Sequence, residues 1–115
     1  MTWTADDSVM ADLRAWLVDQ GFVVLSDSYD SDSFGNQGVV LTRPIAIQLV
    51  RDRGEWGVSI AGSDGAWRWL DRWVTELTPG APQPVSAADQ DAALRALLPE
   101  IEKRSRETRD PGSTE

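Results

Sequence analysis

Residues 45–60 read IAIQLVRDRGEWGVSI, two apolar–polar alternations separated by a short polar break. The apolar residues stand at alternate positions, namely Ile45, Ile47, Leu49, Trp56, Val58 and Ile60. A period of two is typical of β-strands that bury one face, and a break of a few residues containing Gly54 suits a hairpin turn. We therefore predict a β-hairpin whose apolar rows lie on one face of a sheet, under a cover of helices.

Two more strands are predicted upstream of the hairpin. Residues 22–25 form a short apolar run, and residues 38–43 read GVVLTR. Pro44 lacks an amide donor, which predicts a bend or a sheet edge between the second and third strands. With strands at 22–26, 37–43, 45–51 and 55–61, the short connections favour an antiparallel four-stranded meander.

Helices are predicted on both sides of these strands. Thr4 and Asp7 have the spacing of a capping box, and apolar residues follow at helical spacing as far as Gly21, which is placed to end the helix. A second helix is predicted over residues 66–77. Its apolar face carries Trp67, Leu70, Val74 and Leu77, with Trp73 at the flank and Trp69 furthest from the centre.

A third helix is predicted after Ser86, beyond the proline-rich connector of residues 78–85. Pro99 should kink or split it near Leu98. The expected fold is α+β in two layers, with the order α-β-β-β-β-α-α and one domain over residues 1–104. Residues 105–115 offer no apolar side chain to bury, so we expect a frayed or disordered tail.

Composition narrows the functional classes. The chain has 115 residues, a formal net charge of −8, and neither cysteine nor histidine. Thiol catalysis, histidine bases and Cys/His metal sites are therefore excluded, and we expect no cofactor and no metal. The negative charge disfavours nucleic-acid binding. The first residues are unlike a signal peptide and no segment is long enough to span a membrane, so we expect a cytoplasmic protein.

Residues 26–33, SDSYDSDS, predict an acidic loop. No basic residue stands between Arg14 and Arg43, so its charge should be unneutralised. Asp30 and Asp32 have the first spacing of an EF-hand, but Phe34 and Leu41 occupy positions where that motif needs oxygen ligands. We instead predict a surface that contacts a partner protein. Its candidate residues are Asp27, Tyr29, Asp30, Asp32 and, from the second helix, Trp69.

Three segments of residues 34–60 carry a resemblance to a known class: FGN at 34–36, VVL at 39–41 and IQLVRDRGEW at 47–56. They resemble the sheet region of small cytoplasmic immunity proteins from bacterial polymorphic-toxin and contact-dependent inhibition systems. The resemblance implies a non-enzymatic inhibitor, a monomer or weak homodimer, that neutralises a cognate toxin domain by protein–protein contact. The acidic charge favours a basic partner domain.

Two other functions remain open from the sequence. A secretion chaperone or adaptor that binds an effector segment would also be small, acidic and α+β; it would expose a larger apolar patch and dimerise. A small hydrolase would need converging carboxylates, for instance Asp30 with Glu55.

Overall fold

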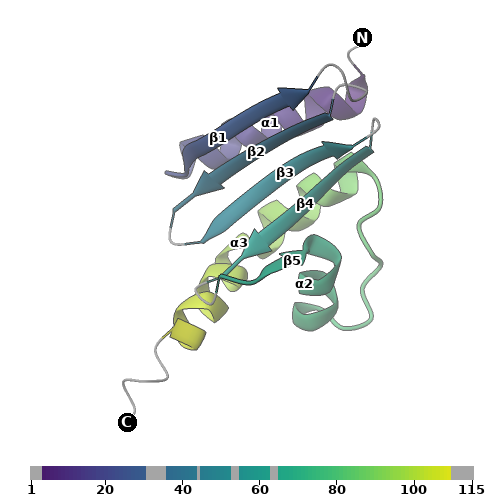
Figure 1. Ribbon diagram of the computed structural model, residues 1–115. Helices are drawn as coiled ribbons and strands as arrows, with labels where there is room; N and C mark the ends of the chain where they lie inside the picture. The colour runs from purple at the N-terminus through teal and green to yellow at the C-terminus, as the bar shows by residue number, and fades with distance from the viewer. Residues whose placement is uncertain (1–3, 31–35, 44, 53–54, 63–64, 110–115) are drawn as a thin grey trace.

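The computed structural model describes residues 4–30, 36–43, 45–52, 55–62 and 65–109. It is an α+β fold with five antiparallel strands in the order β1-β2-β3-β4-β5 (Figure 1). The elements along the chain are α1 (Ala5–Asp19), β1 (Val23–Asp30), β2 (Asn36–Thr42), β3 (Ala46–Asp52), β4 (Glu55–Ala61), β5 (Trp67–Trp69), α2 (Leu70–Leu77) and α3 (Ala87–Arg109). The predicted fold class and meander topology are confirmed, with one strand more than expected.

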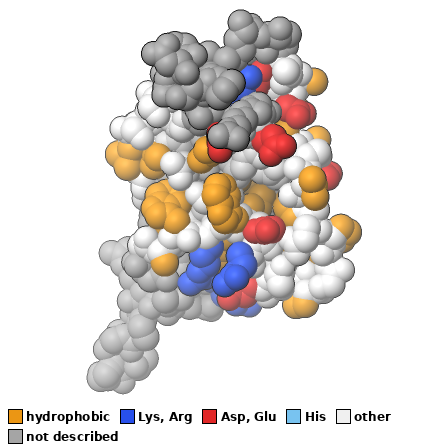
Figure 2. All heavy atoms as spheres, turned by 45° about the vertical axis from the view of Figure 1, so that its right-hand side comes forward, with side chains coloured by type: hydrophobic (Ala, Val, Ile, Leu, Met, Phe, Trp, Pro, Cys, Tyr) orange, Lys and Arg blue, Asp and Glu red, His pale blue; other side chains and the backbone are white. Residues whose placement is uncertain are grey.

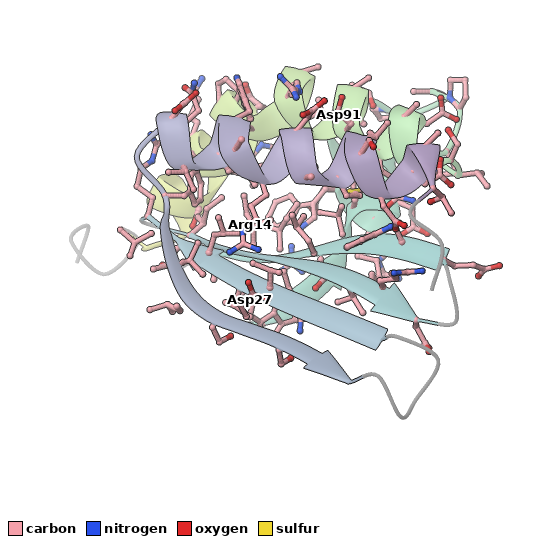
Figure 3. All side chains as sticks on the ribbon, turned by 90° about the horizontal axis from the view of Figure 1, so that it is seen from above. Arg14, Asp27 and Asp91 are labelled. Carbon is pink, nitrogen blue, oxygen red and sulfur yellow. The ribbon has the colours of Figure 1, made fainter. Side chains whose placement is uncertain are left out.

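The helices α1 and α3 lie across one face of the sheet, so the molecule has two layers (Figures 1 and 3). The core between the layers takes Val39, Leu41, Ile47, Leu49, Val58 and Ile60 from the strands, Met10, Leu13 and Leu17 from α1, and Leu94, Leu98 and Ile101 from α3. The strand residues are those at alternate positions, which point to the same side. Each such buried side chain stabilises the fold by about 1.5–3 kcal/mol.

The hairpin predicted from residues 45–60 is confirmed. Its register runs from Ala46 opposite Ala61 to Asp52 opposite Glu55. The buried pairs Ile47↔Ile60 and Leu49↔Val58 stand directly opposite each other, as the two alternations require. The turn residue Gly54 and the predicted bend at Pro44 lie outside the described residues.

The N-terminal helix also matches its prediction. Asp7 N donates to Thr4 Oγ1 at 3.1 Å, and Thr4 N donates to Asp7 Oδ2 at 2.9 Å, which completes the capping box. The helix ends at Asp19, and Gly21 follows with a φ of 101°, a conformation that glycine adopts without a Cβ penalty.

The prediction of a loop over residues 26–33 is wrong for its first half. β1 continues to Asp30, with Ser26 opposite Val40 and Asp30 opposite Asn36. Because an edge strand pairs along one side only and leaves many side chains in solvent, serine and aspartate are compatible with it. Residues 31–33 lie outside the described part.

The second predicted helix starts later than expected. Residues 67–69 form β5 and pair with β4, and α2 begins at Leu70. Trp73, placed at the flank of the helix in the prediction, is buried, whereas Trp67, placed on its apolar face, is 47% exposed. Aromatic residues favour strands, and a strand of three residues, two of them tryptophan, suffices here because β4 supplies the pairing partner.

The third helix is longer than predicted and is not split. α3 runs through Pro99 to Arg109, and Pro99 is exposed. Residues 105–109 are therefore helical instead of frayed, and Ser105 is buried. The rest of the expected tail, residues 110–115, lies outside the described residues. The predicted connector over residues 78–85 contains neither helix nor strand.

Candidate protein-binding surface

One face of the sheet has no helix over it in the described part of the chain (Figure 1). We call it the open face. Strand alternation and register place on it Ser26, Ser28, Gly38, Val40, Thr42, Ala46, Gln48, Val50, Gly57, Ser59, Ala61, Trp67 and Trp69. Contacts between neighbouring strands agree with this placement: Ser28 Oγ donates to Gly38 O at 3.4 Å, and Ser59 Oγ donates to Gln48 Oε1 at 3.3 Å.

None of these open-face residues is charged, although 26% of the chain is Asp, Glu, Lys or Arg. Among the described strand residues on this side, the register places charges only at strand ends: Asp52 and Glu55 beside the β3–β4 turn, and Asp30 where β1 ends opposite Asn36. The solvent side of an antiparallel sheet is ordinarily polar, and depletion of charge is typical of the centre of a protein interface. The open face therefore has the composition of a contact surface.

Trp67 and Trp69 are the largest side chains on the open face. They stand on edge strand β5 opposite Ala61 and Ser59, with 47% and 55% of their surface exposed. Ala61 and Ser59, which pair with these two tryptophans, are only 5% exposed although they belong to the uncovered side.

Gly57 explains how the second indole lies so close to the sheet. A Cβ at this position would stand 3.0 Å from Trp69 Cζ3. The missing side chain lets the indole rest against the backbone of β4. Figure 2 shows hydrophobic side chains gathered across the middle of this side of the surface, with basic and acidic groups beside them.

A groove of about 170 Å³ lies next to Trp69. Its lining residues are Gly57, Val58, Trp69, Leu70, Asp71, Pro84 and Gln90. β5 pairs only with residues 59–61, so the groove follows the part of the β4 edge that β5 leaves uncovered. We call it the edge groove.

Of the predicted contact residues, the two whose side chains the structure describes, Asp27 and Trp69, lie far apart. Asp27 faces α1, where its Oδ2 lies 2.8 Å from Arg14 Nη1, so this charge is neutralised, contrary to the expectation (Figure 3). Tyr29 and Asp30 lie in β1, and their side chains, like all of Asp32, are outside the described part. Trp69 lies on the opposite edge of the sheet. Four strand spacings of about 4.8 Å separate β1 and β5 by about 19 Å.

Sequence reasoning missed Trp67, Gly57 and the edge groove. The available signal was the i, i+2 spacing of Trp67 and Trp69, which puts both indoles on one side of a strand and on different sides of a helix. Trp69 was selected because a helical wheel left it outside the core. It is exposed, but on an edge strand.

Trp56, the tryptophan of the resembling motif, is part of an internal polar cluster. Its Nε1 donates to Asp7 Oδ1 at 2.8 Å, and Arg51 Nε lies 3.6 Å from the same oxygen. Burial alone would raise the pKa of Asp7, but hydrogen bonds from Thr4 and Trp56, with the charge of Arg51, hold this pKa below its ordinary value. The cluster ties α1 to the hairpin.

The two cavities described for this chain are small. No group of three or more His, Cys, Asp or Glu side chains among them could hold a metal ion. A second cavity, of about 120 Å³, lies between α1 and the sheet and is lined by Asp7, Met10, Ala11, Arg14, Val39, Leu49 and Trp56. This cavity and the edge groove are both smaller than the roughly 300–1,000 Å³ typical of ligand pockets.

Comparisons of the chain with protein-family models, curated proteins and solved structures find no match. The described helices include none with the length and apolar character needed to cross a bilayer.

Proposed function

We propose that this chain is a non-enzymatic immunity protein that binds a bacterial toxin domain through the open face and so blocks its activity. The supporting observation is the open face, which carries charges only at the strand ends and has Trp67 and Trp69 half exposed on it. The resemblance of residues 34–60 to immunity proteins supplies the class of partner.

The two tryptophans would provide most of the binding energy. A tryptophan can bury about 150–250 Å², of which roughly half remains available on each indole. At about 25 cal/mol per Å², covering the exposed part contributes about 2.5 kcal/mol for each residue. That is the magnitude of an interface hot spot, and tryptophan is among the residues enriched at such positions.

The charge of the chain would act at an earlier step. A net charge of −8 attracts a basic domain over a distance and raises the association rate at low salt. Docking then brings the charge-free centre of the open face into contact without desolvating an unpaired charge. The acidic charge would thus set the association rate, and the two indoles would set the lifetime of the complex.

The test is a growth rescue. The reading frame next to this gene is cloned, the C-terminal domain of its product is expressed from an inducible promoter, and this chain is co-expressed. We expect the domain to stop growth, the wild-type chain to restore it, and a Trp67→Ala/Trp69→Ala variant to fail. Val18→Ala is the control, because Val18 is also 47% exposed but lies on α1.

A toxic domain that the wild-type chain does not neutralise would refute the proposal. Binding to an unfolded segment of the neighbouring protein, without neutralisation, would instead support the chaperone or adaptor function. Thermal unfolding of each variant shows whether a lost rescue reflects lost binding, because a folded variant retains the wild-type transition.

A further inference from the structure

The edge groove contains a nearly buried side chain with an unused hydrogen-bond acceptor. Gln90 is 7% exposed, and its Nε2 donates to Trp56 O at 3.0 Å and to Val85 O at 3.1 Å. Both partners are carbonyl oxygens, so the amide orientation is fixed by its surroundings. Gln90 Oε1 accepts no hydrogen bond from any described residue, and it belongs to a side chain that lines the groove. The groove therefore offers a hydrogen-bond acceptor that no described residue uses.

A carboxylate stands in the same groove. Asp71 is exposed in the first turn of α2 and forms no ion pair with a described residue. The nearby Arg68 is engaged elsewhere: its Nη1 lies 3.7 Å from Glu76 Oε2, and its guanidinium stacks on Trp73. Arg72, also exposed, follows Asp71 on the helix and does not line the groove. The charge that a ligand would meet in the groove is negative.

The indole of Trp69 forms an aromatic wall of the groove. Elsewhere in this chain, guanidinium groups stack on aromatic rings at 5.0–5.2 Å: Arg43 on Phe22, Arg68 on Trp73 and Arg95 on Trp16. The last case includes a carboxylate as well, because Arg95 Nε lies 2.8 Å from Asp91 Oδ1. Asp91 is labelled in the helical layer of Figure 3. Arg95 is therefore bound by the ring of Trp16 and the carboxylate of Asp91 at the same time.

We propose that the edge groove binds an arginine side chain of the partner protein, with its guanidinium over Trp69 and hydrogen-bonded to Asp71 and to Gln90 Oε1. This inference rests on the proposed function, since the arginine comes from the bound domain. A guanidinium suits the site better than an ammonium because it is planar, weakly hydrated and carries five donors. A groove of about 170 Å³ has room for one side chain, and the charge of −8 favours a cationic one.

The probe is N-acetyl-arginine amide, titrated into the full ¹⁵N-labelled chain while the indole N–H resonances are followed by NMR. A Trp69→Phe variant assigns the resonance of Trp69. We expect a saturable shift of this resonance, and a several-fold weaker response to the uncharged isostere N-acetyl-citrulline amide. N-acetyl-lysine amide should also bind more weakly, because an ammonium cannot stack as a planar group.

Asp71→Asn should weaken the binding of the arginine probe by about threefold to tenfold, the range for losing one exposed charge-assisted contact. Asp89→Asn is the matched control. Asp89 is also an exposed acid in the first turn of a helix, so both variants change the net charge equally, but Asp89 does not line the groove. It should leave the affinity unchanged.

Three results would overturn the inference: no saturable shift of Trp69, an equal response to the citrulline probe, or an equal effect of the two asparagine variants. The growth rescue separates this failure from that of the proposed function. If Asp71→Asn rescues as well as Asp89→Asn while Trp67→Ala/Trp69→Ala does not rescue, the arginine site is wrong and the immunity function stands. If the wild-type chain does not rescue, the immunity function is wrong, while the probe titration still decides whether the groove binds a guanidinium.

Discussion

Replacing Asp7 with alanine should be among the most destabilising changes to a single polar side chain in the described part. The Asp7 side chain is buried, accepts hydrogen bonds from Thr4 N and Trp56 Nε1, and lies close to Arg51 Nε. Losing the capping contact costs about 1 kcal/mol, and the partly buried indole N–H of Trp56, left without its acceptor, adds a cost of about 1–3 kcal/mol. Arg51 is 8% exposed and would also lose a counter-charge. The expected loss in the free energy of unfolding is about 3–5 kcal/mol at neutral pH.

The cost of Asp7→Ala should depend on pH. Because the folded-state pKa of Asp7 is lowered, its charged form stabilises the wild type above the pKa of an unfolded aspartate, about 3.9. That contribution is lost as the pH falls through the lower folded-state pKa. Urea unfolding of the wild type and the variant should thus give a difference that is largest near neutral pH and smaller in acid.

Asp6→Ala is the control for this prediction. Asp6 lies in the same first turn of α1 but is exposed, so its removal should cost less than about 1 kcal/mol. If Asp7→Ala were no more destabilising than Asp6→Ala, or if its cost were the same at acid and neutral pH, the buried cluster would not have the role assigned to it.

Three further changes test the fold and the surface. Ile47→Ala removes a fully buried side chain from the hairpin and should lower the free energy of unfolding by about 2–5 kcal/mol in urea titrations. A Gly57→Ala variant, whose new Cβ stands 3.0 Å from the indole of Trp69, should displace that ring and reduce its NMR response to the arginine probe, while thermal unfolding stays close to wild type. A double-mutant cycle on Arg14 and Asp27 should give a coupling of about 0.2–1 kcal/mol, because both side chains are partly exposed.

The hairpin was predictable because its signal is local. Burial of one face imposes a period of two on residues 45–60, and that period stands in the sequence whatever the rest of the chain does. The strands at the two edges were harder to identify. The second half of β1 has the serine and aspartate content of a loop, and β5 lies inside a segment whose apolar spacing also fits a helix. In both cases pairing with a neighbouring strand decides the structure.

The candidate surface depended still more on contacts between distant residues. The ion pair between Asp27 and Arg14 joins β1 to α1. It could not be predicted from the sequence, where no basic residue stands near Asp27. The open face, with its charges confined to strand ends, combines residues from five strands and becomes visible only once the register is known. The sequence placed Trp69 furthest from the apolar face of a predicted helix, whereas its contact with Gly57 and its place beside the edge groove required the fold.

The role of the open face is tested most directly by calorimetric titration of the purified C-terminal domain encoded by the adjacent reading frame. The wild-type chain should bind it one to one. Removing both Trp67 and Trp69 should weaken binding by roughly three to four orders of magnitude, from about 5 kcal/mol of lost indole burial, and Val18→Ala should leave it unchanged. An affinity that survives the loss of both tryptophans would contradict the account.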